Sequence, residues 1–166
     1  MGVDTNAILS KSTKVTDIVK HISDNFDHVE LHTHKSVEYY FTITFKDGTD
    51  NRNLSVFTDY SISNRDYGIP GILISLSHWG NSVEIMKYIL DEFGGYIDED
   101  DSDDVPFLPY KENSESFNKF KNDPGLSDLD IFKQEVLSQV GLDLLDDVMN
   151  LCEYYRANGL SIMGQP

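Results

Sequence analysis

The sequence predicts an α+β fold: a four-stranded, mostly antiparallel sheet with two helices on one face, followed by a C-terminal acidic helical extension. Residues 71–93 change from a nearly continuous apolar run to apolar residues at helical spacing, which is typical of a buried strand followed by a helix. Residues 37–45 alternate between apolar and polar side chains, as a half-buried strand does. Residues 98–166 carry 16 acidic and five basic side chains, which sets this part apart from the rest.

The fold is expected to be organised around residues 71–93. The predicted strand has the apolar residues Ile72, Leu73, Ile74 and Leu76, and the predicted helix buries Ile85, Met86, Ile89, Leu90 and Phe93. A sharp corner, residues 77–80, separates them. Asn81 precedes Glu84 by three residues, which is the spacing of a helix-capping box. Gly94 is well placed to end the helix.

The elements before residue 71 complete the predicted sheet. Residues 1–12 are expected to be a loose leader, and Thr13 to cap a first helix that buries Val15, Ile18, Val19, Ile22 and Phe26. Three strands follow, at residues 28–34, 37–45 and 53–58. Asp47-Gly48 is a turn signal, and residues 59–70 are expected to be a polar loop. Tyr96-Ile97 can add a short edge strand.

The chain after residue 97 divides into an acidic run and a helical extension. Residues 98–104 hold six carboxylates in seven positions, whose mutual repulsion favours an extended, solvated segment. Residues 105–110 are apolar and stiffened by proline, and are expected to lie back across the domain. Helices are predicted at 114–121, 127–140 and 143–157. We therefore expect an α+β domain at 1–110, and a helical extension at 111–166 that packs on it or forms a small subdomain.

Charge limits the classes of partner. The chain of 166 residues has 29 acidic and 13 basic side chains, a formal net charge of −16. Such a field repels nucleic acids and anionic membranes and attracts cationic surfaces, although acidity can also simply maintain solubility. No apolar run is long enough to span a bilayer, and there is no signal-peptide pattern. With a single cysteine, Cys152, interpreted as a small buried hydrophobe, we expect a cytoplasmic protein.

The acidic side chains form the candidate partner-binding surface. Its predicted members are Asp98, Glu99, Asp100, Asp101, Asp103, Asp104, Asp143, Asp146, Asp147 and Glu153, with Phe107 and Tyr110 as apolar neighbours that give specificity. Carboxylates three or four residues apart on a helix lie about 5–6 Å from one another, a spacing close to that of nucleic-acid phosphates. This surface could therefore bind to the phosphate-binding surface of a partner in place of nucleic acid. An ordinary solvent-exposed face of two helices explains the same pattern.

The residues give less support for a metal site or a catalytic site. A calcium loop starting at Asp98 would need glycine at Asp103 and glutamate at Pro109. His28, Glu30, His32 and His34 would share one strand face, but one strand rarely completes a metal site. His78 follows the predicted central strand without a nucleophile or carboxylate at a recognisable spacing. We expect no catalytic residue, no metal and no cofactor.

Residues 73–85, Leu-Ile-Ser-Leu-Ser-His-Trp-Gly-Asn-Ser-Val-Glu-Ile, and residues 93–101, Phe-Gly-Gly-Tyr-Ile-Asp-Glu-Asp-Asp, carry a resemblance. These segments resemble small uncharacterised acidic proteins of tailed phages and prophages. The resemblance implies a phage accessory protein, made in the bacterial cytoplasm, that binds and blocks a host enzyme or defence complex. It brings no catalytic residues.

Three functions remain open from the sequence. The first is a non-enzymatic acidic protein that docks on a basic surface of a host protein and inhibits it. The second is a small enzyme or ligand-binding domain centred on His78, Trp79 and residues 59–68. The third is a structural or assembly component that forms homo-oligomers through the C-terminal helices.

Overall fold

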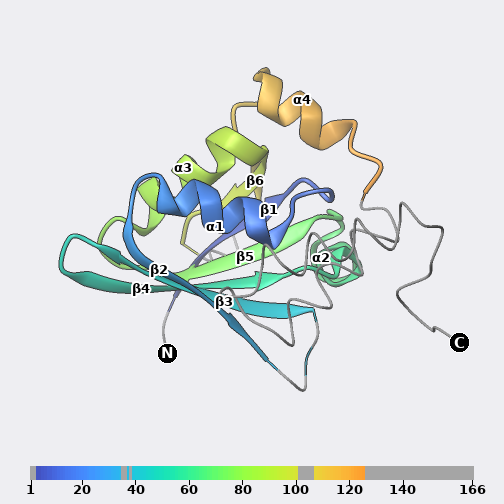
Figure 1. Ribbon diagram of the computed structural model, residues 1–166. Helices are drawn as coiled ribbons and strands as arrows, with labels where there is room; N and C mark the ends of the chain where they lie inside the picture. Colours follow the sequence, from blue (N-terminus) through green and yellow to red (C-terminus); the bar gives the residue numbers. More distant parts are fainter. Residues whose placement is uncertain (1–2, 35–36, 38, 101–106, 126–166) are drawn as a thin grey trace, which may run out of the picture.

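The computed structural model describes residues 3–34, 37, 39–100 and 107–125 (Figure 1). Its strands are β1 (Asp4–Leu9), β2 (Asp27–Thr33), β3 (Tyr40–Asp47), β4 (Asp50–Phe57), β5 (Ile72–Ser77), β6 (Gly95–Asp98) and β7 (Leu108–Pro109). Its helices are α1 (Val15–Ser23), α2 (Tyr60–Tyr67), α3 (Ser82–Phe93) and α4 (Glu115–Lys121).

The strands form one antiparallel sheet in the order β2-β3-β4-β5-β1-β6-β7. Helices α1 and α3 lie on one face of this sheet, and α4 lies beyond α3 (Figure 1). The α+β class is therefore confirmed. The expected four-stranded sheet was too small, because the described residues build seven strands.

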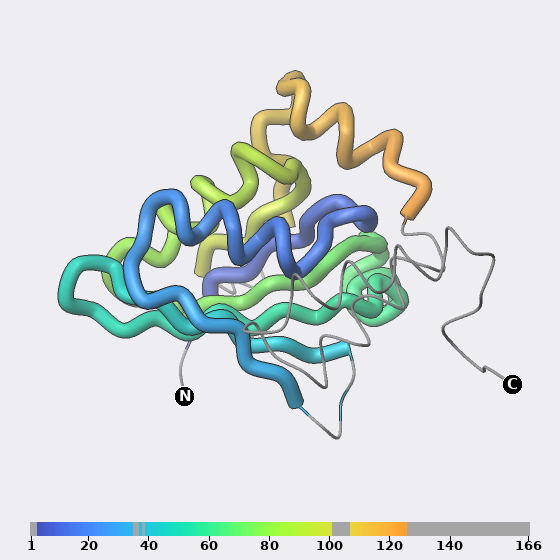
Figure 2. Tube along the Cα trace, viewed as in Figure 1, coloured from blue at the N-terminus to red at the C-terminus, as the bar shows by residue number. Residues whose placement is uncertain are grey.

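The N-terminal segment is a strand in the middle of the sheet and not a loose leader. β1 pairs with β5 on one side and with β6 on the other, and Figure 2 shows it running beside β5. Ala7, Ile8 and Leu9 are fully buried. Only these last three residues of β1 are apolar, so the strand is too short to show a periodic pattern, and its burial comes from its two neighbours.

The core lies between the sheet and helices α1 and α3. Alternate residues of β3 to β5 point into it, including Phe41, Ile43, Phe45, Leu54, Val56, Ile72, Ile74 and Leu76. The predicted apolar stripe of α1 is buried, and the ring of Phe26 packs against Phe45 with centroids 5.0 Å apart. β3 begins only at Tyr40, so Tyr39 lies before the strand and is 42% exposed.

Two local predictions near helix ends had different outcomes. Gly94 ends α3 with φ 72°, as expected. The capping box at the start of α3 was wrong: Asn81 makes no side-chain cap hydrogen bond, and its amide donates to Asp47 Oδ2 at 3.2 Å. The hairpin turn between β3 and β4 brings a competing acceptor to this asparagine. The segment expected to be a polar loop contains α2, capped by Asp59, which accepts from the Ser61 N–H at 3.0 Å.

The chain after α3 returns to the sheet. β6 lies inside the sheet, between β1 and β7, and not at its edge as expected. α4 begins at the predicted place, capped by Ser114, and its Phe117 and Phe120 contact the ring of Tyr96. The predicted helices at 127–140 and 143–157 lie outside the described residues. No helix in the described part of the chain is long and apolar enough to cross a bilayer.

Replacing Gly95 by alanine tests the close packing of β6 on β1. Gly95 has φ 152°, and a Cβ there would overlap the Ile8 carbonyl oxygen. We expect Gly95→Ala to lower the free energy of unfolding by about 3 kcal/mol or more, measured by urea denaturation.

Gly48→Ala is the matched control. Gly48 also has a positive φ, 63°, but no atom lies within 4 Å of an added Cβ. Its cost should be limited to the backbone strain, about 1–2 kcal/mol. Equal losses at the two positions would argue against the described β1–β6 packing.

Candidate protein-binding surface

An exposed tryptophan marks the corner between β5 and α3. The chain leaves β5 at Ser77 and enters α3 at Ser82, and Gly80 makes the turn with φ 54°. Trp79 is 45% exposed, which is unusual for so large an apolar side chain. The adjacent His78 N–H donates to the carbonyl of Val3, another exposed apolar residue, at 2.8 Å.

Arg52 of β4 binds the backbone of this corner and stacks on the ring of Trp79. Its side chain is only 2% exposed, and its Cζ lies 3.9 Å from the centre of a Trp79 ring. Nη1 donates to the Trp79 carbonyl oxygen at 2.9 Å and Nη2 to the Ser77 carbonyl oxygen at 3.0 Å. One guanidinium therefore fixes both the backbone of the corner and the plane of the exposed ring.

The charge of Arg52 is balanced nearby. Burial lowers the pKa of Arg52, whereas the negative charges of Asp47 and Asp50 raise it. The guanidinium remains charged because arginine keeps its proton in proteins. Asp47 and Asp50 pair with each other at the tip of the β3–β4 hairpin, so the same two carboxylates border the corner.

Thr5 connects the corner to the start of the acidic run. Its Oγ1 donates to the Glu99 carbonyl oxygen at 2.8 Å, and lies 2.9 Å from both Ser82 Oγ and His78 Nδ1. These contacts join β1, the corner, the first residue of α3 and the chain just after β6. The described start of the acidic run therefore lies close to His78, the residue before Trp79.

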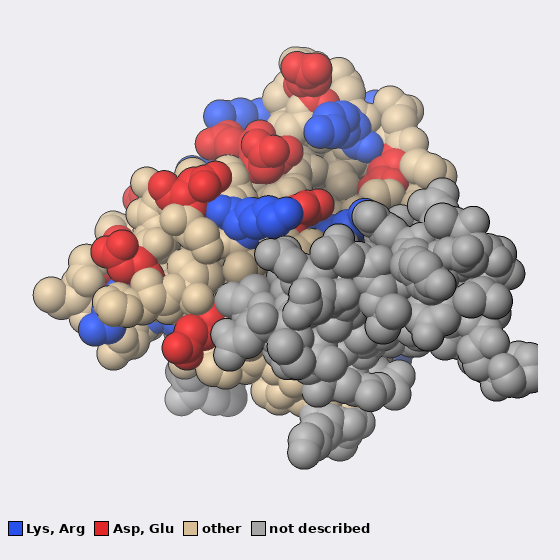
Figure 3. Space-filling view, in the orientation of Figure 1, with Lys and Arg blue, Asp and Glu red and all other residues tan. Residues whose placement is uncertain are grey.

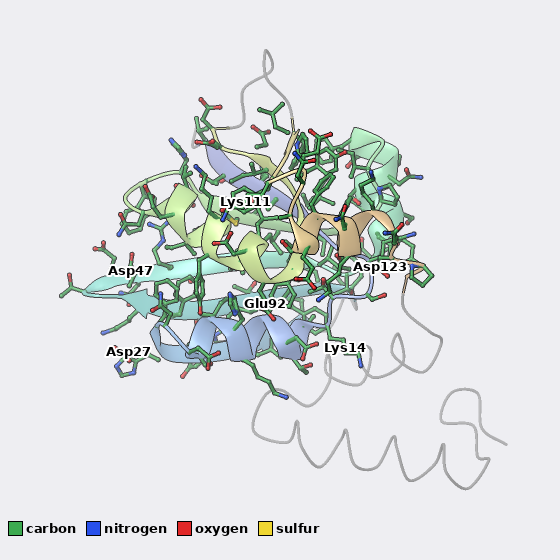
Figure 4. All side chains as sticks on the ribbon, turned by 90° about the horizontal axis from the view of Figure 1, so that it is seen from above. Lys14, Asp27, Asp47, Glu92, Lys111 and Asp123 are labelled. Atoms are coloured by element: carbon green, nitrogen blue, oxygen red, sulfur yellow. The ribbon has the colours of Figure 1, made fainter. Side chains whose placement is uncertain are left out.

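Carboxylates from several elements meet at this end of the sheet. We name as the acidic end the corner residues 77–81 together with Asp4, Asp47, Asp50, Glu84, Glu99 and Asp100. Asp4 is opposite Ser77 in the β1–β5 pairing, Glu84 is in the first turn of α3, and Asp47 is seen at the hairpin tip in Figure 4. Within the described residues, only Glu99 of these six forms an ion pair, with Lys87 at 3.9 Å.

The predicted partner-binding residues are only partly assembled here. Glu99 and Asp100 are exposed and belong to the acidic end. Asp98 does not, because its position in β6 leaves it 6% exposed. The other predicted carboxylates, Asp101, Asp103, Asp104, Asp143, Asp146, Asp147 and Glu153, lie outside the described residues.

The two predicted apolar neighbours have structural contacts. Phe107 is 8% exposed, with its ring edge-on to Tyr67 at 4.8 Å, so it is not available as an interface anchor. Tyr110 is half-buried and donates to Asp91 Oδ1 at 2.9 Å. Burial, and then the bond to Asp91, raise the pKa of Tyr110. Trp79, which is exposed, was not among the residues predicted for the binding surface.

The residues of the predicted enzyme site are separated by the fold. His78 and Trp79 follow the last residue of β5, whereas residues 60–67 form α2 before its first residue. A six-residue strand spans about 20 Å. Ser82, the hydroxyl closest to His78 Nδ1 after Thr5, is 1% exposed and 3.4 Å away, so a substrate cannot reach it.

Two of the three predicted strand histidines, His32 and His34, lie within hydrogen-bond distance of a threonine of β3. His32 Nε2 lies 2.9 Å from Thr44 Oγ1, and His34 Nε2 lies 2.9 Å from Thr42 Oγ1 while its ring stacks on Tyr40. A register shift and φ 54° at His28 interrupt the expected alternation. No group of three or more His, Cys, Asp or Glu side chains in the described ranges is placed to hold a metal ion.

A pocket of about 410 Å³ lies between α3 and α4, lined by groups of both signs, among them Asp91, Glu92, Lys111, Glu115 and Lys119. Figure 3 shows acidic and basic side chains interspersed over the helical side of the molecule. Such a mixed lining favours no single class of charged ligand. The acidic end is therefore the better candidate site.

Replacing Arg52 by methionine tests how Trp79 is held. The variant loses two charge-assisted hydrogen bonds and the ring contact, so we expect the free energy of unfolding to fall by about 2–3 kcal/mol. The fluorescence of Trp79, the single tryptophan, should also report a changed environment.

Arg65→Met is the control, since Arg65 is exposed and, in the part of the chain that the structure describes, forms an ion pair only with its neighbour Asp66. It should leave the unfolding curve and the tryptophan emission unchanged. An Arg52→Met emission spectrum identical to that of the parent protein would contradict the stacked arrangement.

Comparisons with protein-family models, curated proteins and solved structures gave no match for this chain. What the protein does is therefore inferred from its residues and their geometry.

Proposed function

We propose that this protein is a non-enzymatic binding protein that docks its acidic end on a basic surface of another protein. One observation carries the proposal: carboxylates from separate elements, of which only Glu99 forms an ion pair among the described residues, lie at the same end of the sheet as an exposed tryptophan that stacks on a buried arginine. Such a surface suits a partner that supplies positive charge.

The electrostatics favour fast and salt-sensitive association. The chain carries a formal net charge of −16, so the field attracts a basic partner from a distance. Because the described carboxylates of the acidic end are exposed or half-buried, they remain hydrated until the partner arrives. Their contribution should therefore weaken as salt screens the charges.

The apolar part of the surface supplies affinity. Trp79 and Val3 are each 45% exposed and lie at the same end of β1 and β5. Tryptophan is the residue type most often found as an energetic anchor in protein interfaces. Since Arg52 already fixes the ring, little side-chain entropy remains to be lost on binding.

The concrete form of the proposal is a phage-encoded inhibitor that acts in the bacterial cytoplasm. Its partner would be a host defence or nucleic-acid-processing protein, whose phosphate-binding surface accepts the carboxylates in place of nucleic acid. The resemblance of residues 73–85 and 93–101 to phage proteins supports this version. Glu99 and Asp100, two residues of the acidic run, belong to the acidic end.

Affinity capture from bacterial lysate at low and high salt tests the proposal. The protein is compared with the variant Glu84→Gln/Glu99→Gln/Asp100→Asn, and each captured protein is then purified for measurement of Kd. We expect both the triple variant and a several-fold increase in salt to weaken binding by about tenfold or more.

The matched control removes three exposed carboxylates elsewhere, in Asp17→Asn/Asp24→Asn/Glu115→Gln. It should change Kd by less than about twofold. Binding that is insensitive to salt and to the Glu84, Glu99 and Asp100 changes would refute the acidic docking surface.

A further inference from the structure

We propose that the acidic end recognises an arginine side chain of its partner, which stacks on the outer face of the Trp79 indole while neighbouring carboxylates bind its guanidinium. This inference rests on the proposed function and names the group that is recognised. It concerns a specific contact, whereas the docking surface as a whole requires only positive charge.

The two sides of the indole differ. Arg52, 2% exposed, covers the inner side at 3.9 Å, while Trp79 itself is 45% exposed, so the solvent-facing part is the side away from Arg52. The backbone of Trp79 is held because its carbonyl oxygen accepts from both Arg52 Nη1 and the Ser82 N–H, and the ring itself is held by its stacking on the buried Arg52 guanidinium. A flat, immobile aromatic face is therefore presented to solvent.

Carboxylates of the β3–β4 hairpin lie next to the corner that carries this ring. Asp47 Oδ2 accepts from the side-chain amide of Asn81, two residues after Trp79, at 3.2 Å. Asp50 is paired with Asp47 in the hairpin. A group that rests on Trp79 therefore has negative charge from the hairpin nearby.

Arginine satisfies this combination better than other side chains. Its planar guanidinium stacks on an aromatic face, and its five N–H donors bind carboxylates in a forked geometry. Lysine offers a compact, strongly hydrated charge that does not stack. An apolar side chain would bury the neighbouring carboxylates without a counter-charge, which is costly.

Repulsion from Arg52 does not prevent the contact. Asp47 and Asp50 act on the Arg52 charge, as the direction of their effect on its pKa indicates. The local sum of Arg52, Asp47 and Asp50 is negative before a partner arrives. One further guanidinium therefore meets a net attraction.

Trp79 fluorescence provides the test, because the chain has one tryptophan. The full chain is titrated with three blocked peptides of the same length and pattern, which alternate glycine with arginine, lysine or citrulline. We expect the arginine peptide to change the emission of Trp79 and to bind about fivefold or more tighter than the lysine peptide. The neutral citrulline peptide should have no effect. Equal binding of arginine and lysine peptides, or no emission change at millimolar peptide, would overturn the inference.

Two variants separate this inference from the proposed function. Trp79→Leu keeps an apolar side chain but removes the aromatic face, and binding is followed by the anisotropy of labelled peptides after circular dichroism has checked the fold. If Trp79→Leu abolishes the arginine preference but keeps weak, salt-sensitive binding, both proposals stand. If the preference survives in Trp79→Leu, the stacking inference fails and the docking surface stands. If Glu84→Gln/Glu99→Gln/Asp100→Asn binds the basic peptides as tightly as the parent protein at low salt, the docking surface fails.

Discussion

The burial of one charged group, the Arg52 guanidinium, determines the local structure at the end of the sheet. A buried cation must find acceptors and counter-charges, since desolvation would otherwise destabilise the fold. The carbonyl groups of Ser77 and Trp79 supply the acceptors, and Asp47 and Asp50 supply the charge. To present these carbonyls, the chain after β5 must turn over the guanidinium. The indole of Trp79 then covers it, and its other side is left to solvent.

The position of β1 explains why separate parts of the sequence meet there. β1 is antiparallel to both β5 and β6, so its first residues lie beside the last residues of both neighbours. Thr5 uses this position to contact His78, Ser82 and the Glu99 carbonyl together. The corner and the described start of the acidic run, Glu99 and Asp100, which the sequence presents as unrelated features, thereby lie at the same end of the sheet. The corner and the acidic residues together indicate a binding site more clearly than either does alone.

Periodicity predicted the elements whose burial comes from their own apolar residues. This holds for β2 to β5, α1 and α3, and for the capped helix α4. It missed β1, which has only three apolar residues, and α2, in which only Ser63 is buried. Of the acidic end, Arg52 could have been recognised, because it has the same strand parity as the inward-facing Leu54 and Val56. The proximity of Thr5 and Glu99 to His78 could not, since it depends on the unexpected insertion of β1 between β5 and β6.

The central place of β1 also has a consequence for the order of folding. Of the strands in this sheet, β1 is made before the others, but its two partners comprise residues 72–77 and 95–98. The hairpin of β3 and β4 can pair as soon as it emerges from the ribosome, whereas β1 must wait until both of its neighbours have been synthesised. Such long-range pairings slow folding, and until they form, Ala7, Ile8 and Leu9 of β1 remain available for intermolecular association. The chain is therefore open to intermolecular association during synthesis until β6 has been made.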